Sequence, residues 1–335
     1  MEYRELGKTG LKISRLGFGG IPIQRIDAEG TRKLVLEMLE AGVNYIDTAR
    51  GYTVSEEYLG YALEGIRDKF ILASKSMCWD KESMAKSIET SLKNLRTDYI
   101  DLYQLHNPNM AQLEQSMAPG GALEALLEAK AAGKIGHIGL TNHSLEVFKK
   151  ALEFDWMETF MFPYNIVETQ GEATMVKSAQ KGIGFICMKP LAGGAIEDPT
   201  LALRWICANE DVHVVIPGMA DPAELQQNVA AVSNTAPLSP EETAKAMEIR
   251  SALGNNFCRR CNYCQPCSAG INISGCFTFD SYYSRYGLGG WAAERYGVMP
   301  KHASDCVGCG ACEDRCPYHL PIREMLKNVA SHFGY

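Results

Sequence analysis

Residues 99–140 read YIDLYQLHNPNMAQLEQSMAPGGALEALLEAKAAGKIGHIGL and contain one complete unit of the predicted fold. An apolar run, Tyr99–Leu105, is followed by an Ala-, Leu- and Glu-rich helical pattern over 121–132 that ends at Gly133, and then by a second apolar run, Ile135–Leu140. Similar runs alternate with helical patterns from Leu16 to about residue 231: Leu16–Phe18, Tyr45–Thr48, Phe70–Ser74, Thr159–Phe162, Gly184–Met188 and Val212–Ile216. Eight strand–helix units in series predict a parallel sheet closed into a (β/α)8 TIM barrel, an α/β fold.

An open, doubly wound sheet is the alternative to a barrel. It needs a G-x-G-x-x-G phosphate loop after the first strand, and Gly17-Phe18-Gly19-Gly20 lacks that spacing. The segment Tyr3–Ile13, with a turn at 7–10, is expected to form a hairpin that closes the bottom of the barrel.

The domain boundary is predicted at the Pro- and Ser-containing stretch 235–240. Ser239 and Glu242 form a capping-box pattern with Pro240 at the first helical position, which opens a helix to about Leu253. The stretch Gly254-Asn255-Asn256 is expected to end it. We therefore predict a barrel over residues 1–236, a linking helix over 237–254 and a small cysteine-rich domain over 255–335. Asp198-Pro199 and Asp221-Pro222 are expected to begin two barrel helices.

Composition and charge narrow the classes of function. The chain has 335 residues, 46% hydrophobic and 22% charged, with a net charge of −7 and no long basic run, which argues against nucleic acid or an anionic membrane surface as a partner. Apolar runs reach neither the length of a membrane-spanning helix nor, at the N-terminus, that of a signal peptide. We expect a cytoplasmic protein, in which twelve cysteines indicate metal rather than disulfides.

Eight of these cysteines form two groups: Cys258, Cys261, Cys264, Cys267 and Cys306, Cys309, Cys312, Cys316. The second group has the spacing C-x2-C-x2-C-x3-C-P of bacterial ferredoxins, in which the fourth cysteine of each run binds the other of two [4Fe–4S] clusters. Structural zinc is the alternative, which three consecutive two-residue gaps disfavour. We predict a mainly α, ferredoxin-like iron–sulfur domain.

The crossover rule assigns the ligands of the two predicted clusters. Cluster one takes Cys258, Cys261, Cys264 and Cys316, and cluster two takes Cys306, Cys309, Cys312 and Cys267. The first run departs from the ferredoxin pattern, because its last gap has two residues and Ser268 stands where proline is usual. Cys276 is close enough in sequence to replace Cys267, and both possibilities stay open.

Four ionisable residues follow or end three successive predicted strands, where the barrel would direct them to one cavity: Asp47 and Tyr52, Lys75, and His106. A tyrosine needs a nearby cation to act as an acid near neutral pH, because its ordinary pKa is about 10. Lys75 would supply that cation, and Asp47 would hold Lys75 in place. His106 would orient a carbonyl oxygen.

These residues lie in the motifs 47–52 (DTARGY), 71–75 (ILASK), 101–106 (DLYQLH) and 139–142 (GLTN), which resemble the aldo-keto reductases in order and spacing. The resemblance implies reduction of an aldehyde or ketone, or the reverse alcohol oxidation, by hydride transfer with NAD(P)H. It also implies that Tyr52 is the proton donor, that Lys75 with Asp47 lowers its pKa, and that His106 shapes the oxyanion site. Thr141 and Asn142 would contact the nicotinamide carboxamide.

Other expected cofactor contacts depart from the family pattern. Met161 stands where a glutamine is common, and Met188, in the segment Met188-Lys189-Pro190-Leu191, stands where an aromatic residue is common. Family members that use NADPH have lysine and arginine at two positions that bind its 2′-phosphate. When the sequence is aligned on Asn228, these positions are occupied by Gly218 and Glu224. We therefore expect NADH to serve at least as well as NADPH.

Two [4Fe–4S] clusters pass single electrons, whereas hydride transfer moves two, and the sequence shows no flavin motif. The clusters either exchange electrons with a ferredoxin-like partner, sense redox state, or only stabilise the small domain. The alternative function is a redox-sensing or electron-transfer subunit on an aldo-keto reductase scaffold, against which the complete Asp–Tyr–Lys–His set argues. The aromatic segment between the cysteine runs is expected to be a helical insert, and a lid is its alternative.

Overall fold

The computed structural model describes residues 1–254 and 256–335. The chain forms two compact units. The barrel unit comprises Met1–Asn165, Thr169–Pro190 and Asp198–Leu238, and the cysteine-rich unit comprises Ile166–Glu168, Leu191–Glu197 and Ser239–Tyr335. Two short segments from within the predicted barrel range therefore group with the second unit.

The strands of the barrel unit form a parallel sheet that closes on itself. In the described part of the chain the sheet has eight strands in sequence order. They are β3 (Phe18–Gly19), β4 (Tyr45–Asp47), β5 (Ile71–Ser76), β6 (Ile100–His106), β7 (Ile135–Thr141), β8 (Thr159–Pro163), β9 (Gly184–Met188) and β10 (Val214–Val215). Parallel bridges Leu16–Val215 and Gly19–Gly218 join the last strand to the first. The predicted α/β barrel is confirmed, and the open sheet is excluded.

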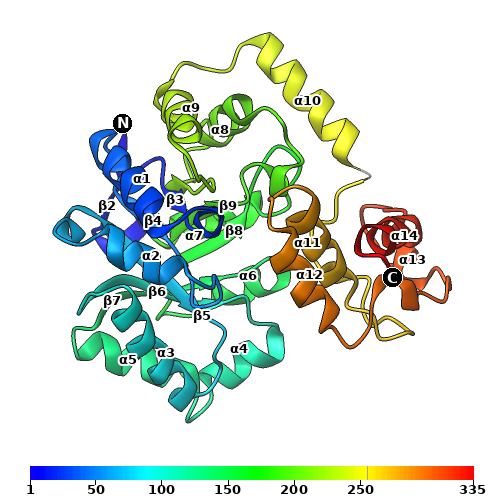
Figure 1. Cartoon of the computed structure of the whole chain (residues 1–335), viewed down its shortest axis with the longest axis horizontal. Helices are drawn as coiled ribbons and strands as arrows, with labels where there is room; N and C mark the ends of the chain where they lie inside the picture. Colours follow the sequence, from blue (N-terminus) through cyan, green and yellow to red (C-terminus); the bar gives the residue numbers. More distant parts are fainter. Residues whose placement is uncertain (255) are drawn as a thin grey trace. The chain divides into compact units, whose positions relative to one another are not determined.

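Helices follow the strands and surround the sheet (Figure 1). In the barrel unit they are α1 (Ala28–Glu40), α2 (Ser55–Ala62), α3 (Lys81–Asn94), α4 (Met110–Met117), α5 (Ala122–Ala131), α6 (Leu145–Ala151), α7 (Glu172–Gln180), α8 (Pro199–Cys207) and α9 (Pro222–Ser233). Short 3-10 helices occupy Gly7–Thr9, Pro22–Arg25, Arg67–Lys69 and Ala192–Gly194. Asp198 and Asp221 cap α8 and α9 through their side chains, with proline at the first helical position, because the sequence supplies a local acceptor for free N–H groups.

An N-terminal hairpin closes one end of the barrel. Strands β1 (Tyr3–Glu5) and β2 (Lys12–Ser14) pair antiparallel, and Leu6 and Ile13 are fully buried in the interior cluster of the barrel. Gly7 packs so closely on the start of β9 that a Cβ there would lie 2.3 Å from the backbone nitrogen of Gly184. The hairpin therefore covers the amino-terminal end of the strands and leaves the carboxyl-terminal end for chemistry.

The cysteine-rich unit is helical. It contains α10 (Pro240–Gly254), α11 (Ile273–Ser284), α12 (Gly289–Gly297), a 3-10 turn at Ala303–Asp305, α13 (Ala311–Asp314) and α14 (Ile322–Phe333). The capping box is present at the start of α10: the Ser239 N–H donates to Glu242 at 2.8 Å, and the Glu242 N–H donates to the Ser239 hydroxyl at 3.1 Å. The helix reaches Gly254, within one residue of its predicted end near Leu253, and Asn255, predicted to help end it, lies outside the described residues.

The insert between the two cysteine runs forms α11 and α12, as the helical interpretation expects. Its Tyr296 is fully buried in a small apolar core that includes Ile271, Leu326 and Val329 and several cysteine side chains. Of the helices in residues 1–254 and 256–335, none combines the length and apolar character needed to cross a membrane.

Candidate functional site

The structure brings the four predicted catalytic residues together at the carboxyl-terminal end of the barrel. Asp47 ends β4, Lys75 lies near the end of β5, and His106 ends β6, while Tyr52 lies in the loop between β4 and α2. The Lys75 ammonium lies 5.0 Å from the centre of the Tyr52 ring. The rings of Tyr52 and His106 meet edge to face, with centres 6.0 Å apart.

Lys75 is held by a buried ion pair. Its Nζ donates to Asp47 Oδ2 and to the Thr48 carbonyl oxygen at 2.8 Å, and both side chains of the pair are almost inaccessible to solvent. Burial lowers the pKa of Lys75, and burial raises the pKa of Asp47, while their mutual attraction opposes both shifts. The Asp47 carboxylate and the Thr48 carbonyl offset part of the cost of burying the Lys75 ammonium beside the tyrosine, in a site from which water is largely excluded.

His106 is uncharged at neutral pH. Burial, with a smaller contribution from the Lys75 charge, lowers the pKa of His106 to about 3. Its Nδ1 is buried and has no hydrogen-bond partner within the described residues. A neutral imidazole can donate one hydrogen bond to a substrate oxygen without titrating between pH 5 and 8.

The sequence did not indicate a role for Glu56, whose buried carboxylate forms hydrogen bonds to several segments of the site. Glu56, at the start of α2, is 1% exposed. It accepts hydrogen bonds from Arg50 at 2.6 Å, from Ser74 at 2.7 Å and from Ser91 at 2.7 Å. Arg50 is two residues before Tyr52, and Ser74 is next to Lys75, so one carboxylate links both catalytic segments. In the sequence Glu56 had the appearance of an ordinary acid in the first turn of a helix.

Gln104 is a second residue that the sequence did not indicate. It is fully buried on β6, opposite Lys75 in the register of the sheet. Its amide donates to Asp47 Oδ1 at 3.4 Å, so it supports the carboxylate that holds Lys75.

The predicted carboxamide contacts lie at the same end of the barrel. Thr141 ends β7 opposite His106. The Asn142 amide donates to the Pro108 carbonyl at 2.6 Å, and its oxygen accepts the Ser144 N–H at 2.8 Å. Asn142 therefore anchors neighbouring loops. Met161 is buried in the barrel interior.

The segment after β9 has an unusual backbone. Lys189 has a positive φ of 54°, and its carbonyl accepts the Asn165 amide at 2.9 Å. Such conformations are costly for residues with a Cβ and occur often at binding sites. Met188, Lys189 and Pro190 belong to the barrel unit, whereas Leu191 belongs to the cysteine-rich unit.

The predicted 2′-phosphate region lies around the start of α9. Glu224 accepts the Ala220 N–H at 2.6 Å and lies 3.8 Å from Arg25 in an ion pair. Arg25, which the sequence reasoning did not consider, brings a cation close to Glu224. Gly218 pairs with Gly19 in the bridge that closes the sheet, and Asn228 is buried on α9.

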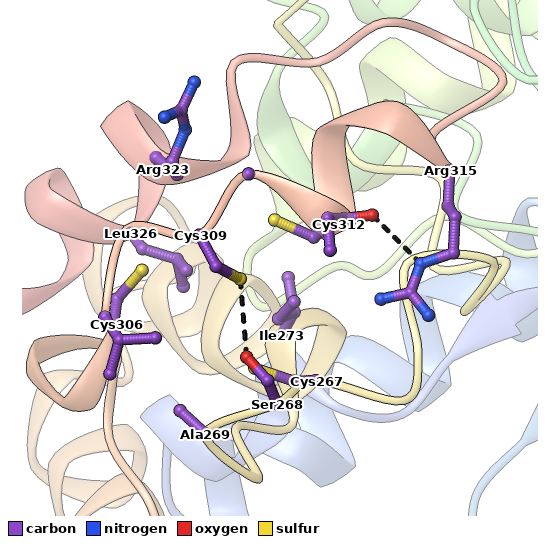
Figure 2. A pocket seen from close by; sticks show the side chains of 13 residues that line it. Cys267, Ser268, Ala269, Ile273, Cys306, Cys309, Cys312, Arg315, Arg323 and Leu326 are labelled. Atoms are coloured by element: carbon purple, nitrogen blue, oxygen red, sulfur yellow. Dashed lines mark hydrogen bonds between the residues drawn. The ribbon is translucent and has the colours of Figure 1, made fainter.

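In the cysteine-rich unit, Cys267, Cys306, Cys309 and Cys312 line one hollow (Figure 2). This is the ligand set predicted for cluster two. Within residues 1–254 and 256–335, no three His, Cys, Asp or Glu side chains come close enough to share a single metal ion. Four cysteine thiols around one hollow are the donors that a [4Fe–4S] cluster requires, so the residues fit such a group. Cys276 is fully buried in the apolar core and does not line the hollow.

Cys264 and Cys261, predicted for cluster one, have cysteines of both runs as neighbours. Burial, and then the neighbouring thiols of Cys258 and Cys261, raise the pKa of Cys264 to about 12. Burial, and further down Cys316, raise the pKa of Cys261. Cys261 therefore has Cys316 of the second run as a neighbour, and Cys264 has Cys312, which is predicted for cluster two, so the ligand set of cluster one stays a prediction.

Comparison with known proteins gives a family for the barrel. Residues 15–200 match the model of the aldo/keto reductase family. The chain belongs to the aldo/keto reductase family. Residues 257–321 match the model of the 4Fe-4S dicluster domain. Both parts of the resemblance seen in the sequence are confirmed.

Relatives of this aldo/keto reductase support the assignment over the barrel. L-galactose dehydrogenase of Arabidopsis thaliana is 28% identical over 304 residues, which cover 74% of this chain and 93% of the relative. Aldo-keto reductase YhdN of Bacillus subtilis is 31% identical over 226 residues, covering 60% of this chain and 66% of the relative. Among solved structures, aldo-keto reductase AKR11C1 from Bacillus halodurans in its holo form has a TM-score of 0.66 at 27% identity, covering 74% of this chain and 96% of that one. The chain is thus an enzyme of an oxidoreductase family, the aldo/keto reductases, with a dicluster domain.

Proposed function

We propose that the barrel unit reduces an aldehyde or ketone by hydride transfer from NAD(P)H, or catalyses the reverse oxidation of an alcohol. The observation that carries this proposal is the Lys75 cation, paired with Asp47 and 5.0 Å from the Tyr52 ring. Desolvation of a buried ion pair can cost more free energy than the attraction between the charges returns. A role in proton transfer would account for a buried cation beside a phenol.

The residues divide the chemistry between them. A bound nicotinamide would supply the hydride to the carbonyl carbon. The Tyr52 hydroxyl would donate a proton to the carbonyl oxygen, so that the product is a neutral alcohol, and the Lys75 cation would stabilise the phenolate left behind. His106, neutral because of its low pKa, would donate a hydrogen bond to the same oxygen as negative charge develops there.

We further propose that NADH is used at least as well as NADPH. A carboxylate, Glu224, lies where a 2′-phosphate clamp would need positive charge, and it is fixed by the Ala220 N–H. The nearby Arg25 is balanced by this same carboxylate. Like charges repel, so a 2′-phosphate would meet Glu224 unfavourably, whereas the 2′-hydroxyl of NADH would be able to donate to it.

The cysteines would hold two [4Fe–4S] clusters, with Cys258, Cys261, Cys264 and Cys316 on one and Cys267, Cys306, Cys309 and Cys312 on the other. When bound, the clusters supply one-electron exchange, with a ferredoxin-like protein as the suggested partner. The alternative of a non-enzymatic redox subunit is disfavoured by the geometry of the four residues in the barrel, which such a subunit would not need.

Replacing Tyr52 tests the enzymatic proposal. Tyr52→Phe removes the proton donor and keeps the ring, so NAD(P)H oxidation with a panel of aldehydes should fall by about 10²–10⁴-fold. Tyr61→Phe is the matched control, because its hydroxyl contacts Glu29 on another helix and its loss should change the rate less than about twofold. Equal rates for Tyr52→Phe and the native protein would remove the assigned role of Tyr52.

A further inference from the structure

The two cysteine runs differ at one equivalent position. Ser268 follows the last cysteine of the first run, and Pro317 follows the last cysteine of the second. Proline has neither an N–H nor a polar side chain, whereas a serine hydroxyl is a hydrogen-bond donor. The first run can therefore donate a hydrogen bond where the second cannot.

The Ser268 hydroxyl is directed at a ligand of the opposite run. Its Oγ lies 3.3 Å from Cys309 Sγ, as Figure 2 shows. A cysteine that binds iron is a thiolate and has no proton to give, so the hydroxyl is the donor in the loaded protein. The contact belongs to cluster two alone, since Cys267 and Cys309 both line its hollow.

Cluster two is also the one with an open side. Cys309 is the exposed cysteine among those described, and Val307 beside it is 70% exposed. Cys312 of the same set is 8% exposed, as buried as Cys264 and Cys316 of cluster one at 9% and 7%, so the open side of cluster two lies at Cys309. Electron tunnelling weakens steeply with distance, so an external carrier exchanges electrons fastest with a cluster whose ligand reaches the surface.

The charge at the hollow favours the reduced state. Arg315 and Arg323 line it. Arg323 is balanced by Glu313 at 2.7 Å, whereas Arg315 donates to the carbonyls of Ala311 and Pro266 and has no acidic partner in the described part of the chain. Reduction adds a negative charge to a cluster, which a nearby cation and a donated hydrogen bond both stabilise.

We propose that cluster two is the electron-exchange centre of this protein and that the Ser268 hydroxyl raises its reduction potential through Cys309. In this step one electron passes from a protein carrier with a one-electron centre to the oxidised cluster. The carrier is oxidised by one electron and the cluster is reduced by one, with no bond made or broken and no proton moved. The proposal rests on the two clusters proposed above and is independent of the Tyr52 chemistry.

Redox titration of the anaerobically purified full chain, followed by EPR, tests the tuning. The variant Cys309→Ser should alter the EPR spectrum of cluster two alone. The redox couple that changes with this spectrum is therefore that of cluster two. Ser268→Ala should then lower the potential of that couple alone, raising its oxidised-to-reduced ratio at fixed potential by about three- to tenfold, where tenfold corresponds to about 59 mV for one electron. Ser268→Thr keeps the hydroxyl and should restore the ratio. Ser284→Ala is the control, because its hydroxyl donates to the Asp280 carbonyl at 2.7 Å, and it should shift neither couple.

Two outcomes would overturn the tuning: an unchanged couple in an iron-replete Ser268→Ala protein, or equal shifts of both couples. Should that variant lose iron, the native protein decides the matter. In deuterated buffer, electron–nuclear double resonance of reduced cluster two should detect one exchangeable deuteron near its sulfur, and its absence contradicts the proposal. Rapid mixing with a reduced ferredoxin tests the exchange role, since reduction of cluster one before cluster two would overturn it.

Discussion

At the scale of single residues, the site depends on charges that are buried but compensated. Lys75 has two oxygen partners, Asp47 and the Thr48 carbonyl, so its charge survives in a region of low dielectric constant. His106 differs from Lys75, because burial and the nearby Lys75 charge lower its pKa and keep the imidazole neutral. One cation and one neutral donor around a phenol is the combination that a carbonyl reductase needs, and each state follows from what the side chain touches.

The choice between NADH and NADPH can be tested by replacing a single residue, Glu224. We expect kcat/KM with NADH to equal or exceed the value with NADPH. Glu224→Lys replaces the repelling carboxylate by a cation and should shift the NADPH-to-NADH ratio of kcat/KM upward by about tenfold or more, because a single charge reversal near a phosphate changes the interaction by about 1–3 kcal/mol. Steady-state kinetics with both cofactors measure this ratio.

The control for this charge reversal is Glu153→Lys. Glu153 is exposed and pairs with Lys150, so the same change in net charge there should leave the ratio unaltered. A native enzyme with a large preference for NADPH, or a ratio that Glu224→Lys does not change, would contradict the assigned role of Glu224.

At the scale of secondary-structure elements, Glu56 connects parts of the barrel that are far apart in the sequence. It lies on α2, Ser91 lies on α3, Ser74 lies on β5, and Arg50 lies in the loop that leads to Tyr52. The Arg50 N–H also donates to the Lys75 carbonyl at 3.0 Å. The position of Tyr52 relative to Lys75 is therefore set by one carboxylate and not by the loop alone.

Neutralising this carboxylate should loosen the site. Glu56→Gln breaks an ion pair with Arg50, whose side chain is 30% exposed. We expect a loss of about 1–3 kcal/mol in the free energy of unfolding, below the cost for a fully buried pair, and a fall of about tenfold in kcat with little change in KM. Urea unfolding and steady-state kinetics give the two quantities. Glu57→Gln, the exposed neighbour on α2, should change neither, and a Glu56→Gln enzyme with native kcat would refute the positioning role.

The features that the sequence predicted correctly at this scale depend on residues that are close together in the chain. The caps at Asp198, Asp221 and Ser239 need only an acceptor and a free N–H a few residues away, and all three are present. The strands were predicted from apolar runs, and the run Val212–Ile216 shortens to Val214–Val215 because pairing with β9 is limited to two residues. Glu56, Gln104 and Arg25 were missed because their partners lie far along the chain, and no spacing rule reports such contacts.

At the scale of the whole molecule, the iron–sulfur run is linked to a loop that follows the barrel strand β8. Arg260 lies between Cys258 and Cys261, and its guanidinium donates to Glu168 Oε1 at 2.7 Å. The Glu168 carboxylate is fully buried. Both residues belong to the cysteine-rich unit, together with Leu191, a predicted cofactor contact. A change at the cysteines can therefore reach the segment 166–168 of the same unit through this ion pair.

Iron removal should expose this link. Chelation of the oxidised protein releases the run 258–267 from its metal, so trypsin should cleave after Arg259 or Arg260, and the KM for the nicotinamide cofactor should rise several-fold as the segments 166–168 and 191–197 loosen. The kcat at saturating cofactor should stay within about twofold, because Asp47, Lys75 and His106 lie in the barrel unit.

Arg260→Gln in iron-replete protein should reproduce part of the rise in KM, whereas Arg295→Gln, on α12 against Trp291, should not. An apoprotein that resists trypsin and keeps the native KM would show that the clusters do not support these loops, and the stabilising role of the metal would have to be abandoned in favour of electron exchange alone.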